Sequence, residues 1–308
     1  MLSKILFFKR LNAKTKPRII ILGMGIGGST CLSYLSKLSN FIEIIVIEKN
    51  QKIRTGPLSN LVIGDILEED YITFKINEKK YKNVKFIYNQ IVFIDSDKQK
   101  IAFSDGVKLN FDFLILSPGI GYKENIINGF SIYDKRNVPH CWDGGSDILS
   151  FKKRLLELED NSKIIISAPD YPYRCPPAPY ERASLIANYK NKIRKNVKII
   201  ILDSKDSFTK QDNFFKEWES NYKDIIEWVP RSKGGRVVFY DHKNNLVKND
   251  QGEIFKADFI HIIPDQKAAK VISDSNLISK EQDWCEINPI SFELNGHKNI
   301  YANYLSYL

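Results

Sequence analysis

A glycine-rich turn between two strongly apolar runs constrains this sequence more than any other feature. The apolar run 19–22 leads directly into a G-x-G-x-x-G turn at 23–28. Apolar residues at helical spacing follow over 29–39, and a second apolar run, 42–47, ends at Glu48, 20 residues after the last glycine of the turn. Because continuous apolar runs are typical of strands buried on both faces, the pattern predicts a strand, a glycine turn, a helix and a second strand.

Each residue of this unit has a physical role in a dinucleotide site. Gly23 permits the tight turn, Gly25 lets a pyrophosphate approach the backbone, and Gly28 lets the helix pack closely on the strand. The helix amino terminus directs unpaired N–H groups toward the phosphates, and Glu48 is placed to accept hydrogen bonds from ribose hydroxyls. The sequence therefore predicts a dinucleotide site. An ordinary glycine turn in an α/β domain is the alternative interpretation.

A further buried strand is expected to return beside this site. Alternation over 84–94 and 100–109 predicts a small antiparallel meander. The strand 111–116 then ends in a turn of small residues made of Ser117, Pro118 and Gly119. We expect this turn to lie beside the bound dinucleotide.

A second α/β unit follows with a different turn. Its predicted elements are a helix, a strand, a helix and a strand at 151–158, 163–168, 180–194 and 197–202. The loop 169–179 holds five prolines and no glycine. Because proline lacks the N–H donor of a phosphate cradle, we expect NAD(P) not to bind here.

Cys175 is the chemically distinctive residue of that loop. It lies beside Arg174 and shortly before the predicted helix at 180–194. A neighbouring cation and a helix amino terminus both favour the thiolate, so we expect a lowered pKa and a reactive thiol. Taken alone, such a cysteine is more often inert than reactive.

Composition excludes several classes of protein. The 308 residues suffice for two domains, and no apolar run approaches the ~20 residues of a membrane helix. The net charge of +9 suits an acidic partner, but the lysines are scattered, so nucleic acid is only a minor alternative. The densest basic cluster is interpreted as the solvated end of a helix and consists of Lys190, Lys192, Arg194, Lys195 and Lys198.

Neither the cysteines nor the histidines form a metal-binding pattern. Cys31, Cys141, Cys175 and Cys285 are widely spaced, and the four histidines form no pair at ligand spacing. We therefore predict no metal. The amino terminus lacks the apolar stretch of a signal peptide, so no export signal is visible.

Several segments, in order along the chain, resemble the flavoprotein chain of flavocytochrome c sulfide dehydrogenase, a relative of the sulfide:quinone reductases. RCPPAPYERAS is the most specific of the resembling stretches. The others are KTKPRIIILGMGIGG, PLSNLVIGD, FLILSPGI, VPHCWDGG, ILDSKDSFTKQ, IEWVP, KADFIHIIPDQKA and DWCEINP.

The resemblance implies two Rossmann-like domains of the glutathione-reductase and sulfide:quinone-reductase type. It implies that the glycine turn and Glu48 hold FAD, that Ser117, Pro118 and Gly119 lie nearby, and that Ser59 and Asn60 lie close to the flavin. Cys175 corresponds to one half of a redox-active disulfide that sulfide attacks before electrons pass through the flavin to a c-type cytochrome subunit. The family is periplasmic, which is the compartment that the resemblance implies.

The sequence also departs from the family. Residues 55–57 read Thr-Gly-Pro where members with covalent FAD carry a cysteine, so we expect non-covalent FAD. The segment 302–304 reads Ala-Asn-Tyr in place of an FAD-binding Gly-Asp pair, so we expect weak FAD binding. The second redox cysteine and the carboxy-terminal part of the family have no counterpart. The alternative function is therefore a non-catalytic, truncated remnant that retains only dinucleotide binding.

The expected domain organisation follows from the two α/β units. We predict a tail over 1–16, an FAD-binding domain over 17–128 and 271–308 that is incomplete at its carboxyl end, and a substrate domain over 129–270 that resembles an NADH domain.

Overall fold

The computed structural model describes residues 16–142 and 147–303. They form two compact units. Unit 1 contains the described residues of 1–53, 73–121 and 267–308, and unit 2 contains those of 54–72 and 122–266. The predicted division at 128 and 270 stays a prediction. Most of the expected tail over 1–16, part of the VPHCWDGG segment and Tyr304 lie outside the described residues.

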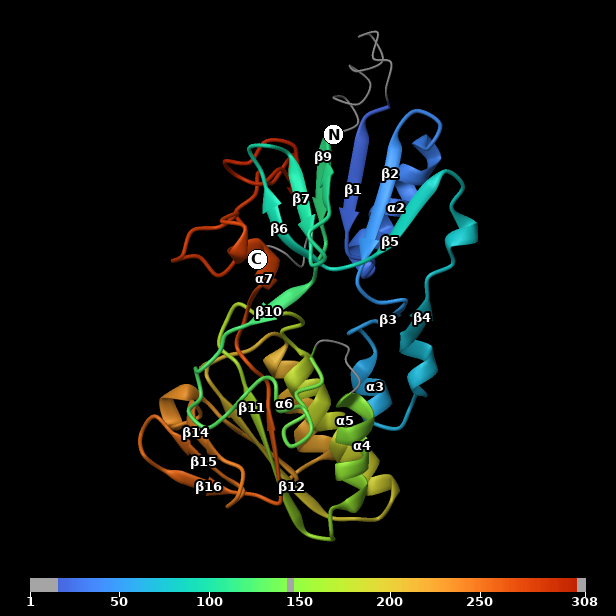
Figure 1. Ribbon diagram of the computed structural model, residues 1–308. Helices are drawn as coiled ribbons and strands as arrows, with labels where there is room; N and C mark the ends of the chain where they lie inside the picture. Colours follow the sequence, from blue (N-terminus) through green and yellow to red (C-terminus); the bar gives the residue numbers. More distant parts are fainter. Residues whose placement is uncertain (1–15, 143–146, 304–308) are drawn as a thin grey trace. The chain divides into compact units, whose positions relative to one another are not determined.

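Unit 1 is built on a parallel sheet with the strand order β19-β9-β1-β2-β5 (Figure 1). Its strands are β1 (Arg18–Leu22), β2 (Glu43–Glu48), β5 (Val84–Tyr88), β9 (Phe113–Leu116) and β19 (Ile300–Ala302). The buried runs of the sequence are confirmed as strands, since Ile19, Ile20 and Ile21 of β1 have no exposed surface.

Each face of this sheet has its own core. On one face, helix α2 (Ile26–Leu35) packs Leu32 and Leu35 against β1 and β2. Side chains of the predicted antiparallel meander belong to the core of the other face. The antiparallel meander consists of β6 (Ile91–Asp95), β7 (Lys100–Phe103) and β8 (Lys108–Asn110). The prediction is wrong for 84–88, because this segment forms β5 and pairs in parallel with β2.

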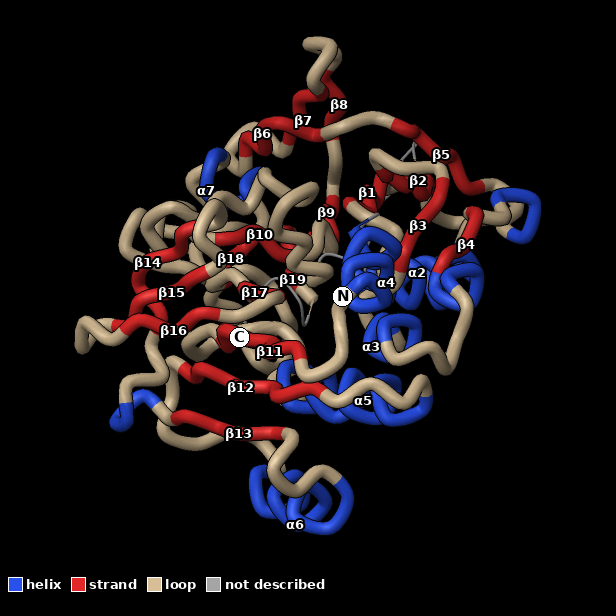
Figure 2. The backbone as a smooth tube through the Cα atoms, turned by 90° about the horizontal axis from the view of Figure 1, so that it is seen from below, coloured by secondary structure: helices blue, strands red, loops and turns tan. Residues whose placement is uncertain are grey.

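Unit 2 is built on a parallel sheet with the strand order β13-β12-β11-β17. Its strands are β11 (Ser162–Ala168), β12 (Val197–Asp203), β13 (Ile226–Val229) and β17 (Phe259–Ile262). Figure 2 shows α5 (Ala178–Lys192) running along β11 and β12. The helix begins two residues earlier than predicted, because Pro179 fits the first turn, where its missing N–H costs nothing.

The remaining elements of unit 2 surround this sheet. They are α3 (Ser59–Ile63), α4 (Asp147–Glu157), α6 (Gln211–Asn221) and the antiparallel strands β14 (Val237–Asp241), β15 (Leu246–Asn249) and β16 (Ile254–Lys256). The segment 54–72 that carries α3 belongs to this unit, where Lys152 Nζ lies 2.6 Å from an oxygen of Asp65. Two α/β units with parallel sheets confirm the predicted fold class.

Several short elements complete the described chain. They are β3 (Lys52–Arg54), β4 (Thr73–Lys75), β10 (Ile120–Tyr122), β18 (Gln266–Ala268), α7 (Lys270–Asp274) and the 3₁₀ turns Ser36–Leu38, Glu69–Ile72, Glu78–Lys80 and Arg231–Lys233. Among the residues described, no helix combines the length and the apolar character needed to cross a bilayer.

One lysine of the basic cluster is not on a solvated surface. Lys190 has no exposed surface, and its Nζ donates to the Leu155 carbonyl at 2.5 Å, in the last turn of α4. Lys195 Nζ likewise donates to the Leu158 carbonyl at 2.6 Å. Both lysines satisfy carbonyls that the end of a helix leaves unpaired. The interpretation of the cluster as a solvated helix end is therefore wrong for Lys190.

Burial of Lys190 makes stability depend on pH in a defined window. Burial, together with the charge of Lys195, lowers the pKa of Lys190 to about 8. In the unfolded chain its pKa is about 10.4, so between these values the folded protein binds fewer protons than the unfolded chain. The contribution of Lys190 to stability therefore rises as pH increases through this window and is lost as pH falls through it.

We expect Lys190→Met to flatten this pH profile. Between pH 7 and 10 the wild-type free energy of unfolding should gain about 2 kcal/mol more than that of the variant. Urea unfolding at a series of pH values measures the difference, and Lys192→Met, at an exposed neighbour, is the matched control. Parallel profiles for the wild type and K190M would show that Lys190 is not a buried cation.

Candidate functional site

The glycine turn of unit 1 is tightly packed at two of its glycines and open at a third. Gly23 has a left-handed φ of +90°, and a Cβ atom there would lie 2.1 Å from the Ser117 carbonyl oxygen. A Cβ atom on Gly28 would lie 1.8 Å from the Gly23 carbonyl oxygen, whereas one on Gly25 would meet nothing within 4 Å. Two glycines are thus required by packing, and the third leaves the backbone open to a ligand.

The helix that follows the turn has an uncapped amino terminus. Gly25 is the N-cap residue of α2, no side chain caps the helix, and Gly25 and Ile26 are exposed. The first N–H groups of the helix are therefore available to an anion. This arrangement fits the pyrophosphate of a dinucleotide.

Glu48 lies at the end of β2 and accepts a hydrogen bond from the glycine turn. Its Oε2 accepts a hydrogen bond from the Met24 N–H at 2.8 Å, and its Oε1 accepts one from the Asn50 N–H at 3.0 Å. A carboxylate has about four acceptor positions, so two remain for the ribose hydroxyls. The predicted role of Glu48 is compatible with this geometry.

Asn303 stands where the family has part of an FAD-binding Gly-Asp pair, and its side chain contacts both turns. It follows β19, and its Nδ2 donates to Ser117 Oγ. A Cβ atom on Gly27 would lie 2.3 Å from this amide nitrogen, so the Asn303 side chain covers the turn at Gly27. Gly119, which has a φ of +81°, has open space around it. The Ser117-Pro118-Gly119 turn therefore lies beside the glycine turn, and its closeness to a bound dinucleotide stays a prediction.

Cys175 lies on a loop of unit 2 that several hydrogen bonds hold. The Cys175 carbonyl accepts from the Ala178 N–H at 2.9 Å, at the start of α5. The neighbouring Arg174 donates its N–H to Gln266 Oε1 at 2.8 Å and accepts from Trp142 Nε1 at 3.1 Å. The residue itself is exposed and its thiol is free.

The predicted lowering of the Cys175 pKa is wrong. Partial burial and the nearby Glu181 carboxylate raise the pKa of this thiol, and they outweigh Arg174 and the Ala178 N–H, which act in the opposite direction. Glu181 lies in the first turn of α5, where its negative charge offsets the helix dipole. Exposure of Cys175, rather than its acidity, distinguishes it from the other thiols.

None of the other three cysteines is paired with Cys175. Cys31 is half-buried in unit 1, and Cys141 and Cys285 are buried. Burial raises the pKa of Cys285 to about 12. None of the four cysteines forms a disulfide.

Ser59 and Asn60 lie on α3 within unit 2, and both are buried. The Asn60 amide nitrogen donates to Glu181 Oε2 at 2.6 Å and to the Ala178 carbonyl at 3.1 Å, and its oxygen accepts from Arg182 Nε at 2.8 Å. The side chain thus anchors the start of α5. The expected closeness of Ser59 and Asn60 to a flavin stays a prediction.

Arg182 is a buried cation that sequence reasoning missed. It is 1% exposed and has no carboxylate within ion-pair distance among the described residues. Its Nη1 donates to the His140 carbonyl at 3.1 Å and lies 2.7 Å from His261 Nε2, and its guanidinium lies 4.8 Å from the Trp142 ring centroid. Burial lowers the pKa of His261 well below its usual range, so His261 is neutral and accepts from Arg182.

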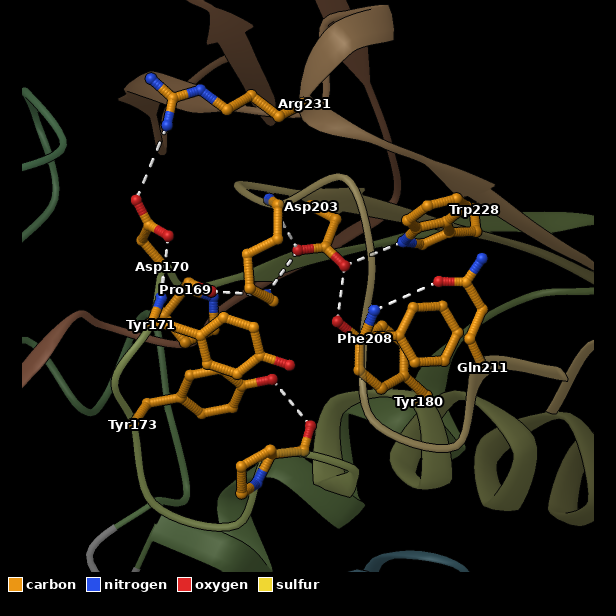
Figure 3. Close-up of polar contacts among 12 residues, drawn as sticks. Pro169, Asp170, Tyr171, Tyr173, Tyr180, Asp203, Phe208, Gln211, Trp228 and Arg231 are labelled. Atoms are coloured by element: carbon orange, nitrogen blue, oxygen red, sulfur yellow. Dashed lines mark hydrogen bonds and ion pairs between the residues drawn. The ribbon is translucent and has the colours of Figure 1, made fainter. Parts of the chain in front are cut away.

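A second polar network lies at the carboxyl edge of the unit 2 sheet (Figure 3). Asp203, fully buried at the end of β12, accepts from Tyr180 Oη at 2.5 Å and from Trp228 Nε1 at 2.8 Å. Its other oxygen lies 2.5 Å from Lys205 Nζ, which also donates to the Pro169 carbonyl at 2.7 Å. An acid in this position of a Rossmann unit binds ribose in NAD-dependent proteins, but here its oxygens are already engaged.

Within the described ranges, no group of three or more His, Cys, Asp or Glu side chains is arranged to hold a metal ion.

Alkylation of Cys175 should reflect its exposure and its raised pKa. We expect iodoacetamide to modify Cys175 before Cys31, Cys141 and Cys285, with a rate that increases up to and beyond pH 9. Because Glu181 raises the pKa, Glu181→Gln should increase the rate at pH 8 by about threefold.

Mass spectrometry of digests after timed alkylation measures these rates, and Glu219→Gln, an exposed carboxylate on α6, is the control. An alkylation rate that is already maximal at pH 7 would contradict the raised pKa of Cys175. An unchanged rate in E181Q would contradict the contribution of Glu181 to that pKa.

Comparison with known proteins finds a family model that matches most of unit 2. Residues 148–264 match the family described as "Sulfide dehydrogenase [flavocytochrome c] flavoprotein chain, central". Coenzyme A disulfide reductase of Staphylococcus aureus (strain Newman) is 26% identical over 125 residues, which span 36% of this chain and 28% of that protein. The chain thus matches less than a third of the length of this curated relative.

Solved structures show the same fold over nearly the whole chain. The sulfide:quinone oxidoreductase of Aquifex aeolicus superposes with a TM-score of 0.77 at 17% identity, covering 95% of this chain and 69% of that one. NDH2 from Plasmodium falciparum in complex with NADH gives 0.73 at 16% identity, covering 95% and 65%. The Bacillus anthracis CoADR-RHD gives 0.68 at 16% identity, covering 96% and 52%.

These likenesses confirm the resemblance drawn from the motifs. The chain has two Rossmann-like domains with the fold of these solved structures, and its residues 148–264 match the family model of the central part of flavocytochrome c sulfide dehydrogenase flavoprotein chains.

Proposed function

We propose that this chain is the flavin-binding chain of an oxidoreductase of the sulfide dehydrogenase type. In this proposal unit 1 binds FAD non-covalently, and Cys175 is the thiol that exchanges with sulfur compounds. The observation that carries the proposal is the exposed, free Cys175 in the RCPPAPYERAS loop, within the segment that matches the family.

The glycine turn supports FAD as the cofactor. Gly25 is open, the amino terminus of α2 is uncapped, and Glu48 keeps free acceptor positions, so the turn and Glu48 would hold the ADP half. The segment 55–57 contains no cysteine, so no thioether to the flavin can form there. When bound, FAD supplies an acceptor for two electrons.

Cys175 would provide the sulfur that sulfide attacks when it is part of a disulfide. Opening a disulfide requires two sulfurs, and the leaving sulfur departs as a thiolate. Cys175 forms no disulfide with Cys31, Cys141 or Cys285 in this structure, so none of these three cysteines supplies the second sulfur. By the family likeness, the electron acceptor is a c-type cytochrome subunit and the compartment is the periplasm.

A second candidate is a non-catalytic protein that retains dinucleotide binding. Two observations favour it: none of the four cysteines forms a disulfide, and the pKa of Cys175 is raised rather than lowered. A thiol without a partner has no disulfide for sulfide to open.

Sulfide-dependent reduction of cytochrome c separates the two candidates. The sulfide dehydrogenase proposal predicts turnover by the FAD-loaded chain that Cys175→Ser lowers by on the order of 10³-fold, because the exchanging sulfur is removed. Cys285→Ser, at a buried thiol, should leave the rate unchanged. Absence of turnover above the rate of free FAD would reject this proposal in favour of the non-catalytic candidate. Equal turnover in C175S would reject the assigned role of Cys175.

A further inference from the structure

Unit 2 contains a cavity that the proposed sulfide chemistry does not use. It has a volume of about 190 Å³ and lies where β11, β12 and β17 end, lined there by Pro169, Ser204 and Pro264. Ligands of parallel α/β sheets bind outside the carboxyl ends of the strands. The cavity therefore occupies the usual position of a ligand in this class of fold.

A dinucleotide does not fit the chemistry of this place. The loop that begins at Pro169 has no glycine to cradle a pyrophosphate, and Asp203 is engaged by Tyr180, Trp228 and Lys205. Because one water occupies ~30 Å³, the cavity holds about six waters. A ligand that lies wholly within the cavity is consequently a molecule of fewer than about ten heavy atoms.

The cavity wall carries both signs of charge. Lys123 and Arg236 supply positive charge, and Asp170 and Asp265 supply negative charge. The Asp170 N–H donates to Asp265 Oδ1 at 3.0 Å, so the two acidic residues lie next to each other. The Arg236 side chain forms no hydrogen bond or ion pair within the part of the chain that the structure describes.

A buried amide donor completes the wall. Gln266 is 1% exposed, and its Oε1 accepts from the Arg174 N–H at 2.8 Å, so the orientation of its amide is fixed. Its Nε2 finds no acceptor among the described residues. A buried donor without a partner is costly, and a ligand carboxylate would satisfy it.

Apolar side chains line the rest of the cavity. They are Ile126, Ile127, Phe130, Ile132, Val237 and Ile263. A ligand that uses the whole wall has a carboxylate, an ammonium group and a small apolar body.

We propose that this cavity binds a small apolar α-amino acid as a zwitterion. Its carboxylate lies toward Arg236 and Gln266 Nε2, and its ammonium group toward Asp170 and Asp265. The proposal is independent of flavin and sulfide, because every residue that it invokes lies in unit 2.

Calorimetric titration of the full chain with L-valine tests this proposal against two matched compounds. Isobutylamine lacks the carboxylate, and 3-methylbutanoate lacks the ammonium group. We expect L-valine to bind at one site per chain, and each half-ligand to bind at least about tenfold more weakly. Arg236→Gln should weaken L-valine binding at least about tenfold, and Arg136→Gln, at an exposed arginine that does not line the cavity, should leave it unchanged.

Three results would overturn the proposal. They are no detectable binding of L-valine, equally tight binding of either half-ligand, and unchanged binding in a folded R236Q variant. NADH that displaces L-valine would assign the cavity to a dinucleotide instead. None of these results depends on whether the chain oxidises sulfide.

Discussion

A guanidinium buried without an ion-paired carboxylate among the described residues holds together the part of unit 2 that carries the exposed thiol of Cys175. Removing a cation from water is expensive unless hydrogen bonds and aromatic faces replace the lost solvation. Arg182 obtains these from Asn60, the His140 carbonyl, His261 and the Trp142 ring, which belong to three separate stretches of sequence. The thiol loop and the start of α5 rest on this network.

The two parallel sheets differ in what the loops at their carboxyl edges can bind. In unit 1 the turn is closed by packing at Gly23 and Gly28 but open at Gly25, so a phosphate can approach the backbone. In unit 2 prolines replace the glycines, and Asp203 is engaged within the protein. The edge of unit 2 thus lacks a dinucleotide cradle and keeps only the small cavity.

Local sequence patterns predict the buried strands and the glycine turn, because residues close together in the sequence determine these elements. Continuous apolar runs gave β1, β2, β11 and β12, since strands buried on both faces contain few polar residues. The glycine spacing likewise predicted the turn before α2, because only glycine meets its packing and backbone requirements.

Interactions between distant residues could not be predicted in this way. Asn60 and Arg182 are 122 residues apart, and no local pattern reveals their hydrogen bond. The pKa of Cys175 was expected to fall because only its neighbour Arg174 and the helix dipole were considered, whereas burial and Glu181 decide its direction. The burial of Lys190 is likewise not visible in the local pattern, because the Leu155 carbonyl to which it donates lies 35 residues away in the sequence.

FAD binding by a variant at the open glycine tests the central claim most directly. Gly25→Asp adds no steric clash, because nothing lies within 4 Å of its Cβ position, but it places a negative charge where the pyrophosphate is expected. In a titration followed by flavin fluorescence, the wild type should bind FAD and release it on acid denaturation, and G25D should bind at least about tenfold more weakly. Ser33→Asp, an exposed site on α2, should bind as the wild type does. Equal FAD binding by a folded G25D variant would contradict the assignment of this turn as the flavin dinucleotide site.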